Sequence, residues 1–118
     1  MLPRIRAICL GLPEVTERLS HGAPTFFVRD RKVFVTAYPD GMHQHQFPHL
    51  WCAAPPGEQE ALVAARPDRF FVPPYVGGRG WLGVRMDGSP DWTEIAELCT
   101  EAYRVIAPKR LVAQLDEA

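Results

Sequence analysis

The chain has 118 residues, of which 47% are hydrophobic and 23% are charged. This length and composition are typical of one globular domain, residues 1–118, that buries about two-thirds of the surface exposed by its unfolded form. The formal net charge of −1 argues against a protein that holds nucleic acid by its overall charge, because non-specific binding comes from Lys and Arg side chains that neutralise phosphates. Only a local basic patch is compatible with such binding.

Cysteine usage and apolar runs indicate the compartment. Cys9, Cys52 and Cys99 are odd in number and widely spaced, which fits neither a disulfide framework nor a close-set zinc motif. We therefore expect all of them to be reduced and mostly buried. No apolar run approaches the roughly 20 residues of a membrane span, and the N-terminus has no hydrophobic signal core. The expected protein is cytoplasmic, without a membrane partner.

The N-terminal segment predicts helical structure. Apolar residues recur at near-helical spacing from residue 2 to residue 12, and Pro13 follows the end of this segment. Residues 13–19 begin with this proline and place Val15 and Leu19 on one face, which predicts one or two further helical turns.

The middle of the chain predicts strands around a short helix. Residues 25–29 and 32–38 are rich in aromatic and β-branched side chains and are joined by a short charged turn, so they predict an antiparallel hairpin. A further strand is expected between residues 43 and 54. Pro56 stands at a first helical position, and the helix that it begins is expected to end near Arg66.

The C-terminal part predicts two strands and then helices. Residues 70–72 and 81–86 are the expected strands. Asp91 begins a segment with a capping-box-like start, whose apolar stripe continues to Ile106 at intervals of three and four residues. Residues 111–115 suggest a short final helix. Strands in a block flanked by helices predict an α+β fold with a mainly antiparallel sheet, in the order α-β-β-β-α-β-β-α.

Two motifs raise the question of a cofactor or metal. Residues 78–83 match the G-x-G-x-x-G spacing of nucleotide-binding loops, but here the motif opens a strand, whereas a phosphate loop must open a helix. His43, His45 and His49 alternate along the chain, yet apart from Cys52 no further ligand lies beside them. A flexible turn and a solvated hairpin edge are the preferred interpretations, so no cofactor and no metal are expected.

The sequence shows no sign of a catalytic group. Ser20 stands next to His21, but adjacency in the sequence does not create a nucleophile and base, and the chain has no nucleophile elbow. The glutamates lie on predicted polar helix faces, and nothing marks two of them as an acid and base. We therefore expect no enzymatic activity.

The predicted hairpin turn is basic. It carries Arg29, Arg31 and Lys32, and Arg79 adds positive charge elsewhere. A protruding basic hairpin suits contact with a phosphate backbone, although charged turns also keep hairpins soluble and protect sheet edges. The large aromatic residues either stack on bases or a ligand, or pack in the core; they are Trp51, Tyr75 and Trp81.

Several segments together resemble one family. Residues 70–83 read Phe-Phe-Val-Pro-Pro-Tyr-Val-Gly-Gly-Arg-Gly-Trp-Leu-Gly, and they are followed by Asp-Trp at 91–92 and Ala-Pro-Lys-Arg-Leu at 107–111. With Leu-Pro-Glu at 12–14 and His-Gly at 21–22, these segments resemble the MmcQ/YjbR-like family over nearly the whole chain.

This resemblance implies a fold and a surface. The family consists of small bacterial proteins that are usually labelled DNA-binding, and its two-layer fold is similar to that of type III secretion chaperones, with helices on one face of a five-stranded antiparallel sheet. It implies no catalytic residue and no cofactor. For DNA contact it points to Lys32, Arg79 and Trp81. Related sequences often carry a Lys before the Pro-Pro pair, where this chain has Ala53.

The resulting expectation is a DNA-binding protein that binds weakly. A protein- or peptide-binding module is one alternative, which an exposed apolar patch would favour. A small-ligand-binding domain is another, which a pocket with convergent polar groups near Trp81 and Tyr75 would favour. The residues assigned to nucleic-acid contact are Arg29, Arg31, Lys32, Arg79 and Trp81.

Overall fold

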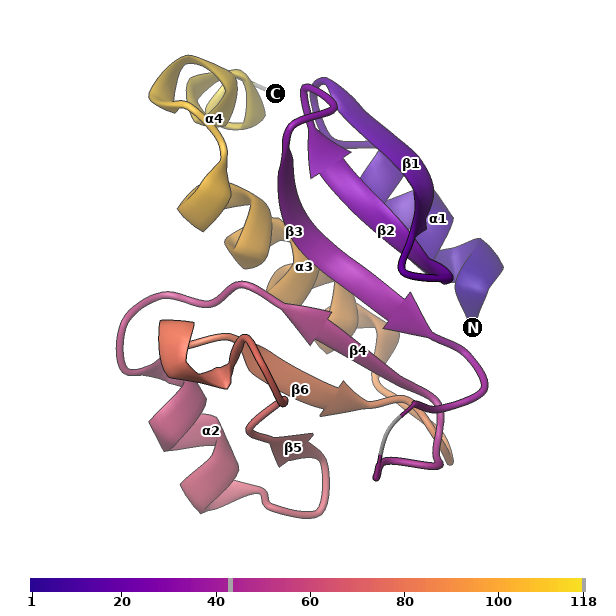
Figure 1. The fold of residues 1–118 in the computed structure, drawn as a ribbon. Coiled ribbons are helices and arrows are strands. Elements are labelled where there is room, and N and C mark those ends of the chain that lie inside the picture. The colour runs from indigo at the N-terminus through magenta and orange to yellow at the C-terminus, as the bar shows by residue number, and fades with distance from the viewer. Residues whose placement is uncertain (43, 118) are drawn as a thin grey trace.

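The computed structural model describes residues 1–42 and 44–117. Along the chain the elements are α1 (Leu2–Leu10), β1 (Val15–Ser20), β2 (Ala23–Val28), β3 (Lys32–Tyr38), β4 (His49–Cys52), α2 (Glu58–Ala65), β5 (Phe70–Phe71), the 3-10 helix η1 (Gly77–Arg79), β6 (Leu82–Arg85), α3 (Trp92–Ile106) and α4 (Lys109–Asp116). The strands form one six-stranded sheet in the order β1-β2-β3-β4-β6-β5 (Figure 1), and every neighbouring pair is antiparallel. The predicted α+β fold with an antiparallel sheet is confirmed.

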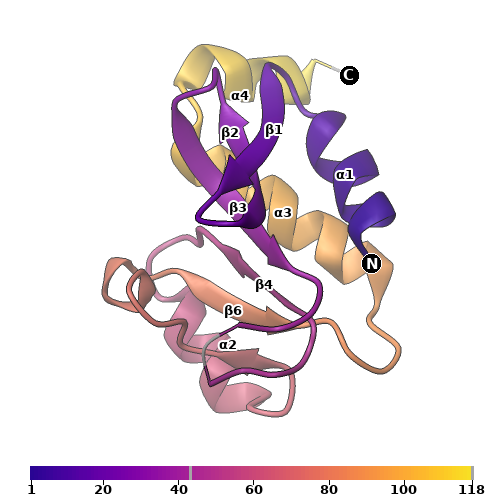
Figure 2. The ribbon, with the colours of Figure 1, turned by 45° about the vertical axis from the view of Figure 1, so that its right-hand side comes forward.

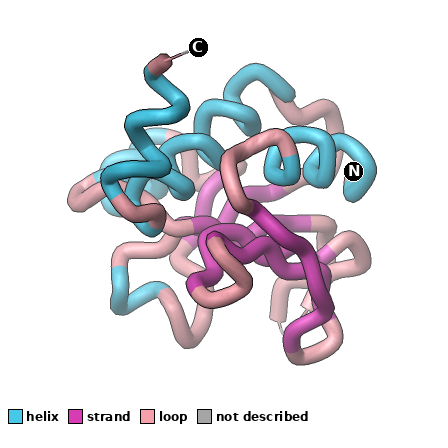
Figure 3. The backbone as a smooth tube through the Cα atoms, turned by 90° about the horizontal axis from the view of Figure 1, so that it is seen from above, coloured by secondary structure: helices cyan, strands magenta, loops and turns pink. Residues whose placement is uncertain are grey.

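Helices α1 and α3 form a layer on one face of the sheet. Figure 2 shows both helices on the same side of the strands, and the view from above in Figure 3 shows the same separation of helices and strands. Helix α2 packs against β5 at one edge of the sheet. The opposite face of β2, β3 and β4 is therefore not covered by α1 or α3.

The face that meets α1 and α3 carries the hydrophobic core. Phe34 is fully buried, and its ring meets the ring of Tyr103 in α3 edge to face, with 5.6 Å between the ring centroids. The Tyr103 hydroxyl donates a hydrogen bond of 2.8 Å to the carbonyl of Pro13, so the ring is held at both ends. Four further core side chains are paired across neighbouring strands and are at most 1% exposed: Phe26, Val35, Cys52 and Leu82.

The helical turns expected over residues 13–19 are wrong, because this segment is strand β1. The strand pairs with β2 along its whole length, from Val15 opposite Val28 to Ser20 opposite Ala23. A ladder of backbone hydrogen bonds outweighs the weak preference of a segment this short for a helix. The sheet therefore has six strands, one more than the family resemblance implies. The additional strand is β1, which precedes the first strand of the expected order.

The turn after β1 explains how the strand forms. Only His21 and Gly22 separate the paired ends of β1 and β2, and their φ angles are 50° and 79°. Two-residue hairpin turns in which both residues have positive φ match the twist of the flanking strands. The sequence His-Gly is thus the signal for a hairpin that the helical interpretation overlooked.

The remaining predicted elements are confirmed with small shifts of their ends, namely α1, the β2–β3 hairpin, β4, α2, β5, β6, α3 and the final helix α4. Asp91 caps α3 as predicted, since its carboxylate accepts hydrogen bonds from the backbone N–H groups of Thr93 and Glu94. Among the described residues, no helix combines the length and apolar character needed to cross a membrane.

The cysteines lie together in the core although they are far apart in the sequence. Cys9, Cys52 and Cys99 are free and buried. Hydrogen bonding with Cys99, burial and the proximity of Cys52 raise the pKa of the Cys9 thiol far above its usual value, and burial raises the pKa of Cys52 as well. The thiols of Cys9 and Cys52 therefore stay protonated, and they act as small apolar side chains.

Candidate functional site

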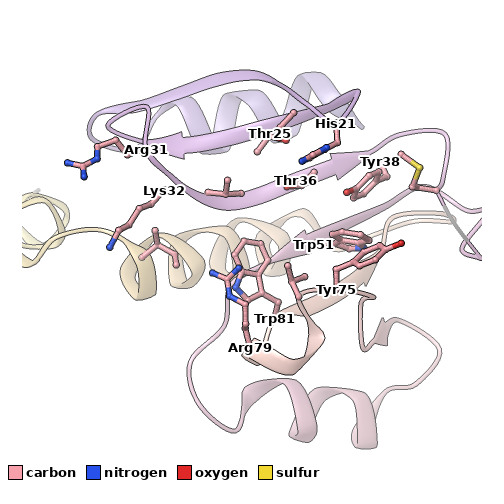
Figure 4. A pocket seen from close by; sticks show the side chains of 15 residues that line it. His21, Thr25, Arg31, Lys32, Thr36, Tyr38, Trp51, Tyr75, Arg79 and Trp81 are labelled. Atoms are coloured by element: carbon pink, nitrogen blue, oxygen red, sulfur yellow. The ribbon is translucent and has the colours of Figure 1, made fainter.

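A hollow of about 920 Å³ lies on the face of the sheet away from α1 and α3 (Figure 4). Thr25, Thr36 and Trp51 form its floor and are paired across β2, β3 and β4. They alternate along the strands with the core side chains, so they point to the opposite face. The walls come from the β1–β2 turn, the β2–β3 turn, the segment 75–81 and the end of α3.

The β2–β3 turn brings two cations to the hollow. Arg31 and Lys32 are exposed and line it. Side chains of β1 hold this turn, because Thr16 Oγ1 donates to a carboxylate oxygen of Asp30 at 2.5 Å and Arg18 donates to the Asp30 carbonyl at 3.1 Å. Asp30 is engaged by β1 and does not line the hollow.

The segment 77–81 brings a third cation, Arg79. The side chain of Gln59, buried on α2, donates hydrogen bonds to the carbonyls of Gly77 and Trp81 at 2.9 Å and 2.5 Å. The Arg79 guanidinium lies 5.4 Å from the centroid of the Trp81 ring, within the range of a cation–π contact. Gln59 therefore fixes the segment that presents Arg79 and Trp81.

The charge of the hollow is positive. No Asp or Glu stands among the described residues that line it. None of the ion pairs found among the described residues includes Arg31, Lys32 or Arg79. Cations in a concave surface without neighbouring carboxylates create a positive potential that attracts anions.

Arg29 differs from the other basic residues of the hairpin. Its guanidinium forms an ion pair of 3.0 Å with Glu14, the residue before β1. It does not line the hollow. The structure thus brings together Arg31, Lys32, Arg79 and Trp81 from the predicted contact residues and leaves Arg29 outside.

Aromatic side chains occupy another part of the hollow. The ring of Tyr38 stacks on that of His49, with 4.9 Å between centroids, and is tilted against that of Trp51 at 4.6 Å. Burial raises the pKa of the Tyr38 phenol above its usual value, so the hydroxyl stays neutral. Tyr75 is 81% exposed and has a φ of 66°, which is uncommon for a residue other than glycine.

A cluster of rings lies beside this aromatic part. His45 stacks on Phe71 at 4.1 Å between centroids, and Arg85 lies 3.9 Å above the ring of Phe47. The centroids of His45 and His49 are 5.8 Å apart, whereas His43 of the same motif lies outside the described residues. Within the described ranges, no group of three or more His, Cys, Asp or Glu side chains could hold a metal ion.

The glycine-rich motif forms a turn. Residues 77–79 form η1, and β6 follows from Leu82 to Arg85. The motif therefore leads into a strand, as predicted, and lacks the following helix that a phosphate loop needs.

Sequence reasoning missed most of the floor of the hollow. Thr25, Thr36 and Tyr38 were assigned to strands and not to a site. The available signal was alternation, because Thr25 and Thr36 interrupt otherwise apolar strands at positions that share one face. Ala53, the position where related sequences often carry a Lys, is buried and does not line the hollow.

Comparisons with known proteins give the family. The family model of YjbR matches residues 10–105, and none of the curated proteins compared with the chain matches it. The crystal structure of Deinococcus radiodurans protein DR2400, which has a DUF419 domain, is similar with a TM-score of 0.76 and 18% sequence identity, over 98% of this chain and 88% of that chain. Identity at this level shows a shared fold alone. The family model spans most of the sequence and confirms the resemblance seen in its motifs, so the chain belongs to the YjbR family.

Proposed function

We propose that this YjbR-family protein is a non-enzymatic nucleic-acid-binding protein that uses the hollow as its contact surface, and that it acts in the cytoplasm. The observation that carries the proposal is that Arg31, Lys32 and Arg79 line one concave surface, with no carboxylate among the described residues of its lining. Three cations in this arrangement suit the phosphates of a nucleic acid. The free, buried cysteines suit a reducing compartment.

The size of the cationic surface limits the affinity. With about three phosphates neutralised, the slope of log K against log salt concentration is expected to be about −2 to −3. The net charge of −1 adds no long-range attraction. Non-specific binding no tighter than about the micromolar range at physiological salt is therefore expected.

Fluorescence anisotropy across a salt series tests the proposal. The triple variant R31Q/K32Q/R79Q should lose most of the binding to a labelled oligonucleotide and most of the salt dependence. The single variant R79Q should reduce the salt slope by about one unit. R4Q is the matched control, because Arg4 carries the same charge but lies on α1 over Trp92, outside the hollow.

Two results would contradict the proposal. The first is binding by the triple variant with unchanged affinity and slope. The second is the absence of binding by the unmodified protein even at low salt. In the second case the alternative of a protein or peptide partner would take precedence, and the hollow would be tested with acidic peptides.

A further inference from the structure

The hollow has two chemically different ends. Figure 4 shows Arg31 and Lys32 at one end and Tyr38, Trp51 and Tyr75 together at the other, with Arg79 beside Trp81 between them. A ligand that fills the hollow must therefore combine an anionic group with a planar, weakly polar group. Most phosphate-binding surfaces need only the first of these.

The cations that line the hollow suit phosphate groups. Arg31 and Arg79 each offer a planar fork of N–H donors, and Lys32 adds a flexible ammonium. Among the described residues, the lining carries no carboxylate that would compete for them. The cation–π contact of Arg79 with Trp81, at 5.4 Å from the ring centroid, keeps that guanidinium beside the hollow.

The aromatic end suits a flat ring. Tyr38 and Trp51 are largely buried and form a packed floor, whereas Tyr75 is 81% exposed. The φ of 66° at Tyr75 costs free energy for a residue other than glycine. Strain of this kind clusters at ligand-binding sites, and here it holds a large exposed ring at the edge of the hollow.

Hydroxyl groups lie between the two ends. Figure 4 shows Thr25 and Thr36 on the floor between Arg31 and Lys32 on one side and the ring of Tyr38 on the other. The Thr25 hydroxyl donates to the carbonyl of Ala23 at 3.0 Å, so its hydrogen is engaged and its oxygen can act toward a ligand only as an acceptor. A sugar hydroxyl is a donor that fits this position.

We infer that the hollow binds one nucleotide unit with its base unstacked, the phosphate at Arg79 and the base against Tyr75, while Arg31 and Lys32 lie where further phosphates of a strand would pass. This inference rests on the proposed nucleic-acid function. Bases of a duplex are stacked on one another, so an aromatic side chain adds affinity only where a base is free. A volume of about 920 Å³ is within the range of small-molecule sites. The same chemistry comes from a single strand or from a free nucleotide.

Competition binding with four probes tests this inference. The probes are single-stranded dT of about 12 nucleotides, an abasic strand with the same number of phosphates, a duplex of equal length, and dTMP. The dT strand should bind at least fivefold more tightly than the abasic strand and the duplex, which is the effect of stacking one base. In Y75A this preference should disappear, and in Y75F, which keeps the ring, it should remain.

The outcomes distinguish failure of the nucleotide-unit site from failure of the proposed nucleic-acid function. Equal binding of dT, abasic strand and duplex, with no effect of Y75A, would overturn the nucleotide-unit site and leave the proposed function standing. No binding of any strand would overturn both. The preference for dT over the abasic strand is measured on the unmodified protein, so the result does not depend on the folding of Y75A. Displacement of dT by dTMP at similar concentration would assign the site to free nucleotides, and failure to displace would assign it to single strands.

Discussion

The two faces of the sheet differ in chemistry although they share the same strands. The face that meets α1 and α3 is built from neutral, fully buried side chains such as Phe26, Val35 and Leu82. The opposite face has a buried floor of Thr25, Thr36 and Trp51, with exposed cations at its rim. The buried side chains of the first face therefore stabilise the fold, whereas the exposed cations at the rim of the second face contribute little to stability and are available for contact with a ligand.

Substitutions on the two faces of the sheet should therefore have different effects. Changes on the helix-facing side should reduce stability strongly. Changes in the rim should alter binding and leave the free energy of unfolding nearly unchanged. The side chains that connect the rim to the core should do both.

The largest effect is expected for Phe34→Ala. The substitution removes a fully buried ring that packs edge to face on Tyr103 and leaves a cavity. Large-to-small changes of this kind lower the free energy of unfolding by about 3–5 kcal/mol. Urea unfolding measures it, with K32A on the other face as a control that changes stability by less than about 0.5 kcal/mol. Similar effects of the two substitutions would contradict the assignment of the faces.

Gln59→Leu should have an intermediate effect on stability and also reduce binding. Leucine keeps the size of the buried side chain but removes both hydrogen bonds, to the carbonyls of Gly77 and Trp81. Leaving buried carbonyls unsatisfied costs about 1–3 kcal/mol. Because the segment presents Arg79, anisotropy with single-stranded dT should show weaker binding as well. Full binding by a destabilised Q59L would show that the segment does not position the rim.

Asp87→Asn should have a smaller, pH-dependent effect. Hydrogen bonds from Arg85, at 3.0 Å and 2.7 Å, lower the pKa of the Asp87 carboxyl. A carboxyl with a lowered pKa in the folded protein stabilises it above the ordinary pKa of about 3.9 and loses this contribution as the pH falls through the folded value. D87N should therefore be less stable at neutral pH by at most about 1 kcal/mol.

The difference between D87N and the unmodified protein should shrink as urea unfolding is repeated at successively lower pH, because the Asp87 carboxyl then becomes protonated. A difference that stays constant over this range would show that the ion pair is not its cause.

The smallest effect on stability is expected for Arg79→Ala. Arg79 takes part in none of the ion pairs found among the described residues, and its side chain is at the surface. The free energy of unfolding should change by less than about 0.5 kcal/mol, while binding to single-stranded dT falls. A large loss of stability would show that Arg79 serves the fold.

The sequence predicted most elements because their signals are local. The Asp91 cap, the apolar stripe of α3 and the β-branched runs of β2 and β3 are each visible within a few residues. Strand β1 was not predicted because Val15 and Leu19 have the spacing of a helix face, whereas the pairing that decides its structure involves residues of β2.

The site was predictable in part. The cations of the hairpin turn and Arg79 could be named from their charge, but nothing local shows that Arg31 and Lys32 line the same hollow as Arg79 or that Arg29 pairs with Glu14. The positive φ of Tyr75 and the anchoring of the segment by Gln59 depend on contacts between distant residues. Contacts between residues far apart in the chain cannot be recognised from a single sequence.

The central claim is that nucleic acid occupies the hollow and not the helix layer, and the three tryptophans report on it directly. Trp51 and Trp81 line the hollow, whereas Trp92 lies under Arg4 on the helix layer. A titration with single-stranded dT, followed by the indole N–H signals in proton–nitrogen NMR spectra, should shift the signals of Trp51 and Trp81 and leave that of Trp92 in place. A shift of the Trp92 signal with those of Trp51 and Trp81 unchanged would contradict the account.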